Sequence, residues 1–318
     1  MSGPPLVVVA SRSFSNHPIL VSELRAKYPN LRLNEAGKSL AGDELVKHLQ
    51  GAERAVIALE KIDASILSRL PDLKIIGKYG VGLDNIDMAA MREHGVKLGW
   101  TGGVNRLGVA ELALELMLGG LRKTWESREL AESGGWVQIR GRQLSGKTVG
   151  IIGFGHVGKE VARILAPFQV RILVNDIKDV SQAAAEAGAE LAEKDQIFAE
   201  ADVITLHTPK TADTTRMIDA RALSMMKPDA VVVNTARGGL IDEQALYDAL
   251  TENRIGAAAM DVFEGEPPGD NPLIKLTNFA ATTHIGGSSE EAVLNMGRAA
   301  IAGLENAVEA VESNFYYR

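Results

Sequence analysis

The sequence predicts an α/β protein with two doubly wound parallel-sheet domains. Short runs rich in Val, Ile and Leu alternate with helix-length amphipathic segments over residues 1–103, and the alternation restarts at Thr148. A chain of 318 residues is long enough for two domains of roughly 100–200 residues each. Its 46% hydrophobic content can supply a core for both, so a disordered chain is excluded.

The first predicted sheet occupies residues 1–103. Its strands are expected at Leu6–Ala10, Arg54–Leu59, Leu73–Gly77 and Val96–Gly99, with helices at His17–Tyr28 and Ile62–Leu70. A Thr-Gly-Gly stretch at 101–103 ends this pattern, and a long helix follows from about Asn105 to Lys123. Because this helix is too apolar for one face to be wet, it is expected to pack on two sides.

The second predicted sheet lies within residues 104–284. Its strands are expected at Val149–Ile152, Val170–Val174, Val203–Leu206 and Ala230–Asn234. Each is a short apolar run, which is typical of strands buried on both faces. A last helix is expected at Ser288–Glu312, because serine followed by two glutamates is a good capping pattern at its start.

The composition narrows the function classes. The 34 Lys and Arg residues against 41 Asp and Glu residues give a net charge of −7, which argues against a general nucleic-acid or membrane binder. Because there is no cysteine, disulfides, a thiolate nucleophile and cysteine-ligated metals are excluded, and no metal site is expected. No apolar run approaches the ~20 residues that span a bilayer, and no signal peptide is expected at the N-terminus. These features favour a cytoplasmic protein.

A glycine-rich turn follows the first strand of the second sheet. Residues 150–158 read Gly-Ile-Ile-Gly-Phe-Gly-His-Val-Gly, which indicates a strand, a tight turn and a helix start. Gly153 allows the bend, Gly155 lets backbone approach a pyrophosphate, and Gly158 lets the helix pack closely on the sheet. The next strand ends at Asp176, whose carboxylate can accept both ribose hydroxyls and would repel the 2′-phosphate of NADP. NAD is therefore favoured over a turn that binds no ligand.

Three polar segments follow later apolar runs, at the strand ends where ligands of open α/β sheets gather. Reduction of a carbonyl by hydride leaves an alkoxide, so it needs a proton donor near neutral pH, and histidine fits. A carboxylate fixes the tautomer of such a histidine and stabilises its cation. A 2-oxo acid also needs a planar cationic fork, which is arginine. The three segments supply one of each: Arg237, Glu266 and His284.

The chain resembles the D-isomer-specific 2-hydroxyacid dehydrogenase family, which includes phosphoglycerate dehydrogenase, D-lactate dehydrogenase and glyoxylate/hydroxypyruvate reductase. The motifs that carry the resemblance are Lys78–Asp87, Val109–Ala113, Gly153–Gly158, Asn234–Asp242, Asp261–Pro267 and His284–Gly287. The resemblance implies a Rossmann-type NAD-binding domain, residues 104–284, inserted into a flavodoxin-like substrate domain, residues 1–103 and 285–318.

The resemblance also implies a role for each matching residue. Arg237 would bind the substrate, His284 would be the acid/base, and Glu266 would be its partner. The expected substrate-binding residues are Tyr79, Gly80, Val81, Gly82 and Asn105. The expected cofactor contacts are Gly153, Gly155, His156, Val157, Gly158, Asp176, His207, Thr208, Pro209, Thr235, Ala236 and Asp261, the last at the nicotinamide amide. The helix at 105–123 is expected to form a homodimer interface.

The sequence therefore predicts an NAD-dependent D-2-hydroxyacid dehydrogenase, which transfers a hydride reversibly between nicotinamide and a small 2-oxo or 2-hydroxy acid. A 3-phosphoglycerate dehydrogenase-like enzyme, a glyoxylate/hydroxypyruvate reductase and a non-catalytic NAD(H)-sensing protein of the same fold stay open. A relative of adenosylhomocysteine hydrolase is weaker, because cysteine is absent. Glu60 would repel a phosphate near its loop, whereas Lys61 and Lys78 could be either cationic substrate contacts or exposed lysines.

Overall fold

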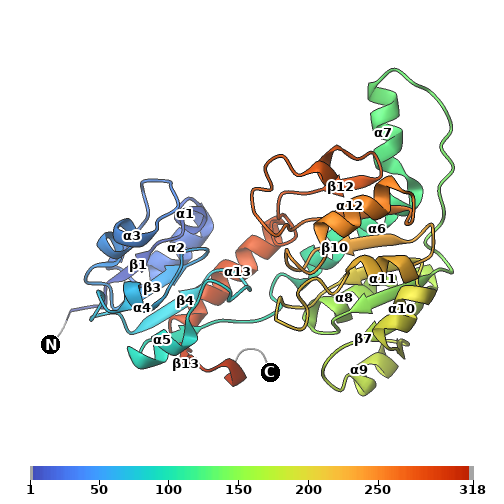
Figure 1. Ribbon diagram of the computed structural model, residues 1–318. Coiled ribbons are helices and arrows are strands. Elements are labelled where there is room, and N and C mark those ends of the chain that lie inside the picture. Colours follow the sequence, from blue (N-terminus) through green and yellow to red (C-terminus); the bar gives the residue numbers. More distant parts are fainter. Residues whose placement is uncertain (1–2, 315–318) are drawn as a thin grey trace. The chain divides into compact units, whose positions relative to one another are not determined.

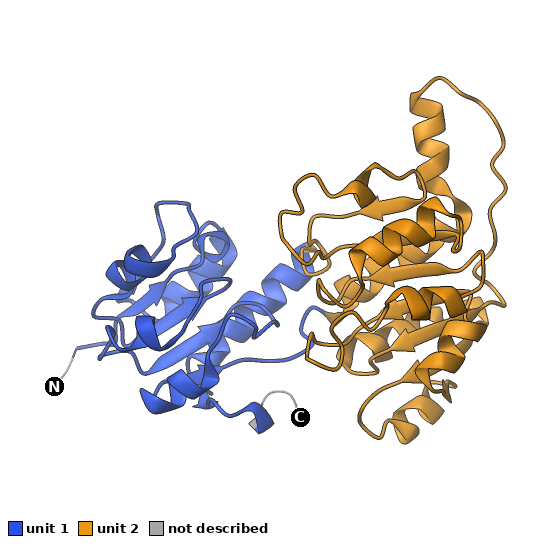
Figure 2. Cartoon of the chain, viewed as in Figure 1, with its two compact units in different colours: residues 1–105, 290–318 blue, residues 106–289 orange. Residues whose placement is uncertain are grey.

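The computed structural model describes residues 3–314. The chain forms two compact units, coloured separately in Figure 2, which divide at Asn105/Arg106 and at Ser289/Glu290. Unit 1 therefore combines the first part of the chain with its last part, and unit 2 is the continuous stretch 106–289. The boundaries expected from the sequence, after residues 103 and 284, lie two and five residues from these positions.

The sheet of unit 1 is parallel except at one edge. Its strands are β1 (Val7–Val9), β2 (Leu31–Arg32), β3 (Arg54–Ile57), β4 (Ile75–Lys78), β5 (Lys97–Gly99) and β13 (Val308–Glu309). They lie in the order β13-β5-β4-β3-β1-β2. The edge strand β13 runs antiparallel to β5, with Val308 opposite Leu98. The expected parallel arrangement holds for β1 to β5, and the short β13 adds one antiparallel pair at the edge.

Helices cover both faces of this sheet. They are α1 (Arg12–Ser15), α2 (Pro18–Lys27), α3 (Gly42–Leu49), α4 (Ala64–Leu67), α5 (Met88–Glu93) and α13 (Glu290–Gly303), and a short 3₁₀ turn, η3, spans Glu312–Asn314. One core lies between the sheet and α3, α4 and α5, and a second core lies under α1, α2 and α13. A Cβ at Gly99 would overlap the backbone of Gly303, so only glycine allows α13 this close to β5.

The prediction of one helix over Ser288–Glu312 is wrong in its C-terminal half. The helix ends at Gly303, and the chain continues into β13 on the edge of the sheet. The end of α13 is the point where Gly303 meets the backbone of β5. A glycine also ends helices readily, because it loses more backbone conformational freedom in a helix than any other residue.

The predicted helix at Ile62–Leu70 is also too long, since α4 covers only Ala64–Leu67. The Asp63 carboxylate caps it by accepting hydrogen bonds from the amides of Ser65 and Ile66 at 3.0 and 3.2 Å. Ile62 instead forms a parallel bridge with Ile86.

The sheet of unit 2 is entirely parallel (Figure 1). Its strands are β6 (Thr148–Ile152), β7 (Arg171–Asn175), β8 (Glu190–Leu191), β9 (Val203–Leu206), β10 (Val231–Asn234), β11 (Ala257–Met260) and β12 (Phe279–Ala281). The order β8-β7-β6-β9-β10-β11 is the doubly wound order 3-2-1-4-5-6, and β12 extends it beyond β11. The direction of winding therefore reverses between β6 and β9, where such sheets bind ligands.

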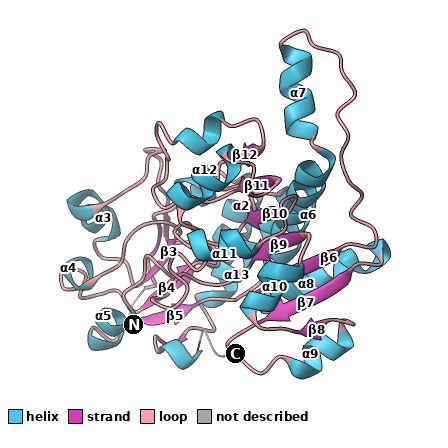
Figure 3. Cartoon of the chain, turned by 45° about the vertical axis from the view of Figure 1, so that its right-hand side comes forward, coloured by secondary structure: helices cyan, strands magenta, loops and turns pink. Residues whose placement is uncertain are grey.

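Helices again lie on both faces, as Figure 3 shows for the central strands of unit 2. They are α6 (Arg106–Arg122), α7 (Thr124–Glu132), α8 (His156–Leu165), α9 (Ser181–Glu186), α10 (Lys194–Glu200), α11 (Ala220–Met225) and α12 (Glu243–Thr251), with 3₁₀ turns η1 (Ala166–Phe168) and η2 (Pro272–Lys275). One core packs under α6 and α8, and the other under α10, α11 and α12. No helix in residues 3–314 is long and apolar enough to cross a membrane.

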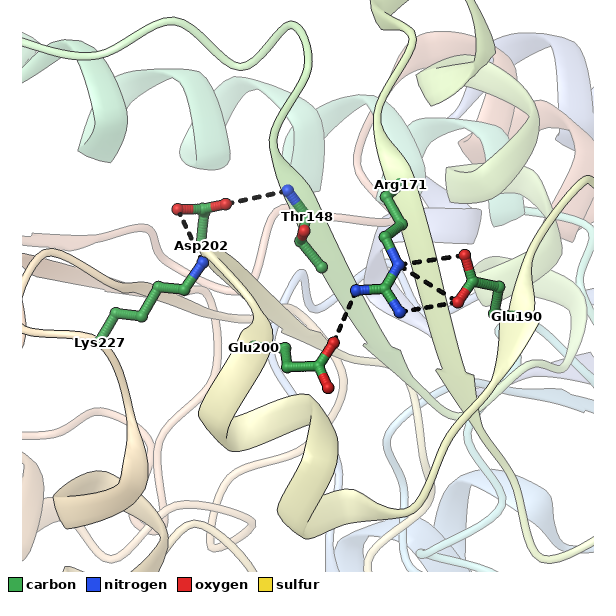
Figure 4. A network of polar contacts seen from close by, with 6 residues as sticks. All are labelled: Thr148, Arg171, Glu190, Glu200, Asp202 and Lys227. Carbon is green, nitrogen blue, oxygen red and sulfur yellow. Dashed lines mark hydrogen bonds and ion pairs between the residues drawn. The ribbon is translucent and has the colours of Figure 1, made fainter.

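Ion pairs fix the amino ends of the strands of unit 2 (Figure 4). Asp202 precedes β9, accepts a hydrogen bond from the Thr148 amide at 2.9 Å, and lies 3.3 Å from Lys227 Nζ. Arg171, at the start of β7, pairs with Glu190 at 2.8 Å and Glu200 at 2.6 Å. The candidate site residues lie at the opposite, carboxyl ends of the strands.

Candidate active site

The glycine turn between β6 and α8 brings two strand ends together at the switch point. The Gly153 amide donates to Asn175 O at 2.8 Å, and the residue has φ +95°. A Cβ at Gly153 would lie 2.5 Å from the His207 carbonyl oxygen, and one at Gly158 would overlap the Gly153 carbonyl. Only glycine therefore allows the ends of β6 and β9, and the first turn of α8, to approach so closely.

The start of α8 is a cationic environment. Gly155 caps this helix without a side-chain hydrogen bond, so the first amides of α8 keep their donor capacity for an anion. His156 is the first helical residue, and burial lowers its pKa, as do the charges of Arg106, Lys159 and Lys178. These three cations and the helix dipole together favour a phosphate group at this place.

Asp176 holds the glycine turn from the end of β7. Its carboxylate accepts hydrogen bonds from the amide of Phe154 at 2.6 Å and from the amide of Lys178 at 3.0 Å. A carboxylate has about four lone-pair positions, so two hydroxyl groups can still donate to it. The position and the chemistry fit a ribose with free 2′ and 3′ hydroxyls.

Three buried polar atoms just after β9 and β10 have no hydrogen-bond partner among the described residues. They are His207 Nδ1, Thr208 Oγ1 and Thr235 Oγ1. The other ring nitrogen of His207 lies 2.9 Å from Thr205 Oγ1, and burial lowers the pKa of His207 to about 3. Unsatisfied buried polar groups call for an explanation, and a polar ligand at the edge of the sheet supplies one. The glycine turn, the start of α8, Asp176 and these three atoms fit a dinucleotide.

The loop after β10 is shaped by its last strand residue. Asn234 is buried, and its side-chain amide donates to Arg237 O at 2.9 Å while its Oδ1 accepts from the Ala236 amide at 3.1 Å. The half-buried Arg237 donates from Nη1 to Ala236 O at 2.7 Å. A Cβ at Gly238 would overlap the Phe263 carbonyl, so this loop packs directly on the one that carries Glu266.

His284 and Glu266 form a hydrogen-bonded pair. His284 Nδ1 lies 2.7 Å from Glu266 Oε2, and Glu266 Oε1 accepts from the Phe263 amide at 3.1 Å. An ionised carboxylate only accepts, so Nδ1 carries the proton and Nε2 is left for exchange with a ligand. Both side chains are partly exposed, as a ligand-binding pair must be. The expected partnership of these two residues is present in unit 2.

Asp261 lies beneath the loop that carries His284. The residue is 1% exposed. Asp261 Oδ1 accepts from Thr282 Oγ1 at 2.6 Å and from the Ile285 amide at 2.7 Å. Asp261 Oδ2 accepts from the Gly286 amide at 2.8 Å. The carboxylate is thus fixed to the chain on both sides of His284.

A family model agrees with these features. Residues 114–286, more than half of the chain, match the model described as D-isomer specific 2-hydroxyacid dehydrogenase, NAD binding domain. The chain belongs to this family.

Relatives within the 2-hydroxyacid dehydrogenase family carry different names. A D-3-phosphoglycerate dehydrogenase from Archaeoglobus fulgidus is 39% identical over 83% of this chain and 51% of its own length. A hydroxypyruvate reductase from Thermotoga maritima is 38% identical over 83% of this chain and 88% of its own. This chain thus spans about half the length of the phosphoglycerate dehydrogenases that it matches first.

A solved structure shares the fold of both units. A putative D-isomer specific 2-hydroxyacid dehydrogenase from Polaromonas sp. JS6 66 superposes with a TM-score of 0.87 at 30% identity. The match covers 95% of this chain and 96% of that one. The two-sheet α/β architecture expected from the sequence is therefore confirmed for this 2-hydroxyacid dehydrogenase family member.

The expected substrate-binding residues of this family member lie in unit 1. Tyr79 is buried, with its ring edge-to-face against Phe14 at 5.5 Å, and burial raises its pKa. Trp100 Nε1 donates to the Val81 carbonyl at 3.0 Å, and Gly80 has φ +122°. Within residues 3–314, the amides of residues 80–82 donate no hydrogen bond. Asn105 is buried at the last position of the first segment of unit 1.

Sequence reasoning missed three residues that shape this site. Asn234 bonds to the Arg237 loop, Thr282 in the His284 loop donates to Asp261, and Thr205 bonds to the His207 ring. An asparagine at the end of a buried strand is a signal for a side-chain-bonded turn and could have identified Asn234. No local pattern identifies Thr282, because its partner Asp261 is 21 positions away.

Proposed function

We propose that this protein is an NAD-dependent D-2-hydroxyacid dehydrogenase that interconverts a small 2-oxo acid and its D-2-hydroxy acid. The observation that carries the proposal is the 2.7 Å pair of His284 and Glu266. The pair lies in loops at the carboxyl ends of the strands of unit 2, as do the glycine turn and the Arg237 loop.

The chain's own residues supply proton transfer and orientation. Protonated His284 donates from Nε2 to the substrate oxygen as the carbonyl becomes an alcohol, and in the reverse direction neutral Nε2 accepts the hydroxyl proton. Glu266 stabilises the imidazolium, and Arg237 binds the substrate carboxylate with its guanidinium fork. The amides of residues 80–82, in unit 1, are proposed separately as substrate contacts. The nicotinamide, when bound, would supply the hydride for reduction and take it up in oxidation.

Two features of the described residues favour an unphosphorylated substrate and NAD. The buried Glu60 carboxylate accepts a hydrogen bond from the Ala58 amide at 2.6 Å, and Lys78 Nζ donates to Ala58 O at 2.5 Å. A fixed carboxylate there would repel a substrate phosphate. Asp176 would likewise repel the 2′-phosphate of NADP.

A substrate panel tests the proposal. NADH oxidation would be followed by absorbance with glyoxylate, hydroxypyruvate, pyruvate and 3-phosphohydroxypyruvate, and each assay repeated with NADPH. We expect turnover with NADH on at least one unphosphorylated acid. Highest kcat/KM on 3-phosphohydroxypyruvate would overturn the substrate preference. Tight NADH binding without oxidation of any acid would indicate an NAD(H)-sensing protein instead.

We also propose a homodimer that forms through α6. A groove beside this helix is lined by Leu114, Leu118 and Trp136, and the Trp136 side chain is 94% exposed. A large exposed aromatic beside an apolar groove is typical of a protein interface. Sedimentation equilibrium should give twice the chain mass, and Trp136→Ser should weaken the assembly. A wild-type monomer at micromolar concentration would contradict this proposal.

A further inference from the structure

The conformation of His284 needs support from its surroundings. His284 has φ +58°, in the left-handed region that side chains other than glycine adopt rarely. Its ring must nevertheless hold one direction to meet Glu266 at 2.7 Å. The Glu266 contact alone does not fix the backbone, because it is made by a side-chain nitrogen and not by the main chain.

The backbone on both sides of His284 is instead held by Asp261. The Thr282 hydroxyl precedes His284 by two positions, and the amides of Ile285 and Gly286 follow it directly. All three donate to one carboxylate, which the strand end of β11 anchors through the Asp261 amide on Asn234 O at 2.9 Å. A Cβ at Gly286 would lie 3.1 Å from Asp261 Oδ2, so the close approach of this loop suits glycine.

We propose that Asp261 is a positioning residue whose carboxylate holds the loop 282–286 in the conformation that directs His284 to Glu266. This role differs from the nicotinamide contact expected from the sequence, and it rests on the proposed function. Both side-chain oxygens must accept, because the amides of Ile285 and Gly286 can only donate and they donate to different oxygens. In Asp261→Asn the side-chain NH₂ would face one of these two amides in either orientation, so the variant loses at least one bond.

The decisive experiment is a double-mutant cycle between Asp261→Asn and His284→Ala. If Asp261 acts through His284, Asp261→Asn should lower kcat about 30-fold in the wild type but less than about threefold in the His284→Ala background. The Kd for NADH should change less than about twofold in both backgrounds. Losses that multiply, together with a weaker Kd for NADH in both backgrounds, would overturn the proposal in favour of a direct cofactor contact.

Two substitutions at Thr282 provide a milder test should Asp261→Asn fold poorly. Thr282→Val keeps the branched shape but removes one donor, and it should lower kcat about fivefold with KM for the oxo acid little changed. Thr282→Ser restores the hydroxyl and should recover most of that loss. Equal kcat values in Val and Ser variants would contradict a role for the Thr282–Asp261 bond.

Asp202→Asn is the matched control, because Asp202 is a carboxylate at the opposite edge of the same sheet (Figure 4). It should lower the urea midpoint and leave kcat unchanged. A loss of kcat equal to that of Asp261→Asn would show that the effect is general destabilisation, and the proposal would fall.

A readout without turnover separates this proposal from the proposed function. In the cofactor-free protein, amide hydrogen exchange at Ile285 and Gly286 should accelerate at least about tenfold in Asp261→Asn, and the His284 ring resonances should shift. If none of the oxo acids tested supports NADH oxidation by the wild type, the proposed function fails. The faster amide exchange in Asp261→Asn can still be observed in that case. If exchange at both amides is unchanged, the positioning role fails whatever the enzyme turns over.

Discussion

At the scale of single residues, the 2.7 Å hydrogen bond between His284 Nδ1 and Glu266 leaves Nε2 as the ring nitrogen that would exchange a proton in the proposed reaction. The Phe263 amide, 3.1 Å from the other Glu266 oxygen, keeps the carboxylate in place. The pair can therefore act as one unit, in which the carboxylate stabilises the charge that the imidazole gains.

Removal of the imidazole should abolish most turnover. His284→Ala should lower kcat by about 10²–10⁴-fold, the range typical of a lost general acid/base, with the Kd for NADH unchanged within about twofold. Glu266→Gln, which keeps the size of the side chain and removes its charge, should give a smaller loss. Steady-state kinetics and fluorescence titration with NADH measure both. A His284→Ala variant with near wild-type kcat would refute the acid/base role.

Burial of His207 should make folding stability depend on pH. Its folded pKa of about 3 lies below the unfolded value of about 6.5, so the unfolded chain binds the extra proton. The contribution of His207 is therefore present above pH 6.5 and is lost as the pH falls from about 6.5 toward about 3. Urea unfolding at pH 7.5 and 5.5 should show a smaller acid-side loss in His207→Gln. Ring resonances of His207 that titrate near pH 6 would contradict this.

At the scale of elements, the long buried strands were predictable and the short or composite elements were not. The strand β9 has the predicted bounds, and β6 and β10 each begin one residue away from the predicted start. A run of four or five apolar residues is typical of a buried strand, which made these elements predictable. The strands β2 and β8 span two residues each, which is too short for any periodicity. The end of α13 depends on Gly99, some two hundred positions earlier, so no local pattern contains it.

The same limit applied to the candidate site. Arg237, Glu266 and His284 could be singled out as candidates because each follows an apolar run and has a side chain suited to one task in the proposed chemistry. The bonds from Asp261 to the His284 loop could not, since they join the ends of β11 and β12 and exist only after the two strands pair.

The contact between α13 and β5 should be sensitive to a single methyl group. In Gly99→Ala the new Cβ would overlap the Gly303 backbone, which cannot move without shifting the helix. Overpacking of this kind costs about 1–3 kcal/mol, so urea unfolding should show a loss in that range. Gly146→Ala is the comparison variant, because a Cβ at Gly146 would have no neighbour within 4 Å. Its φ of +72° adds a backbone strain that is independent of packing. An unchanged midpoint for Gly99→Ala would contradict the close packing.

At the scale of the whole molecule, the two units have separate cores, so a ligand that binds one unit should stabilise that unit more than the other. All of the expected NAD contacts lie in unit 2, and each unit has cores on both faces of its own sheet. A ligand stabilises only the part of the chain that it binds when folded.

NAD⁺ should therefore raise the stability of unit 2 more than that of unit 1. At a concentration of about 100 times Kd, the gain is about 2.7 kcal/mol. Pulsed hydrogen exchange with mass spectrometry, run across a urea series, reports on peptides from each unit in the same sample. Peptides from 148–286 should shift to higher urea with ligand. Equal shifts in both units would show a single cooperative transition instead.

The split of unit 1 across the chain has a consequence for synthesis on the ribosome. The first 105 residues emerge without α13 and β13, so β4 and β5 lack the helix that covers Gly77 and Gly99. Residues 106–289 then leave the exit tunnel as one continuous stretch and can fold at once. One face of the sheet in unit 1 therefore stays uncovered, and accessible to chaperones, until α13 has been synthesised.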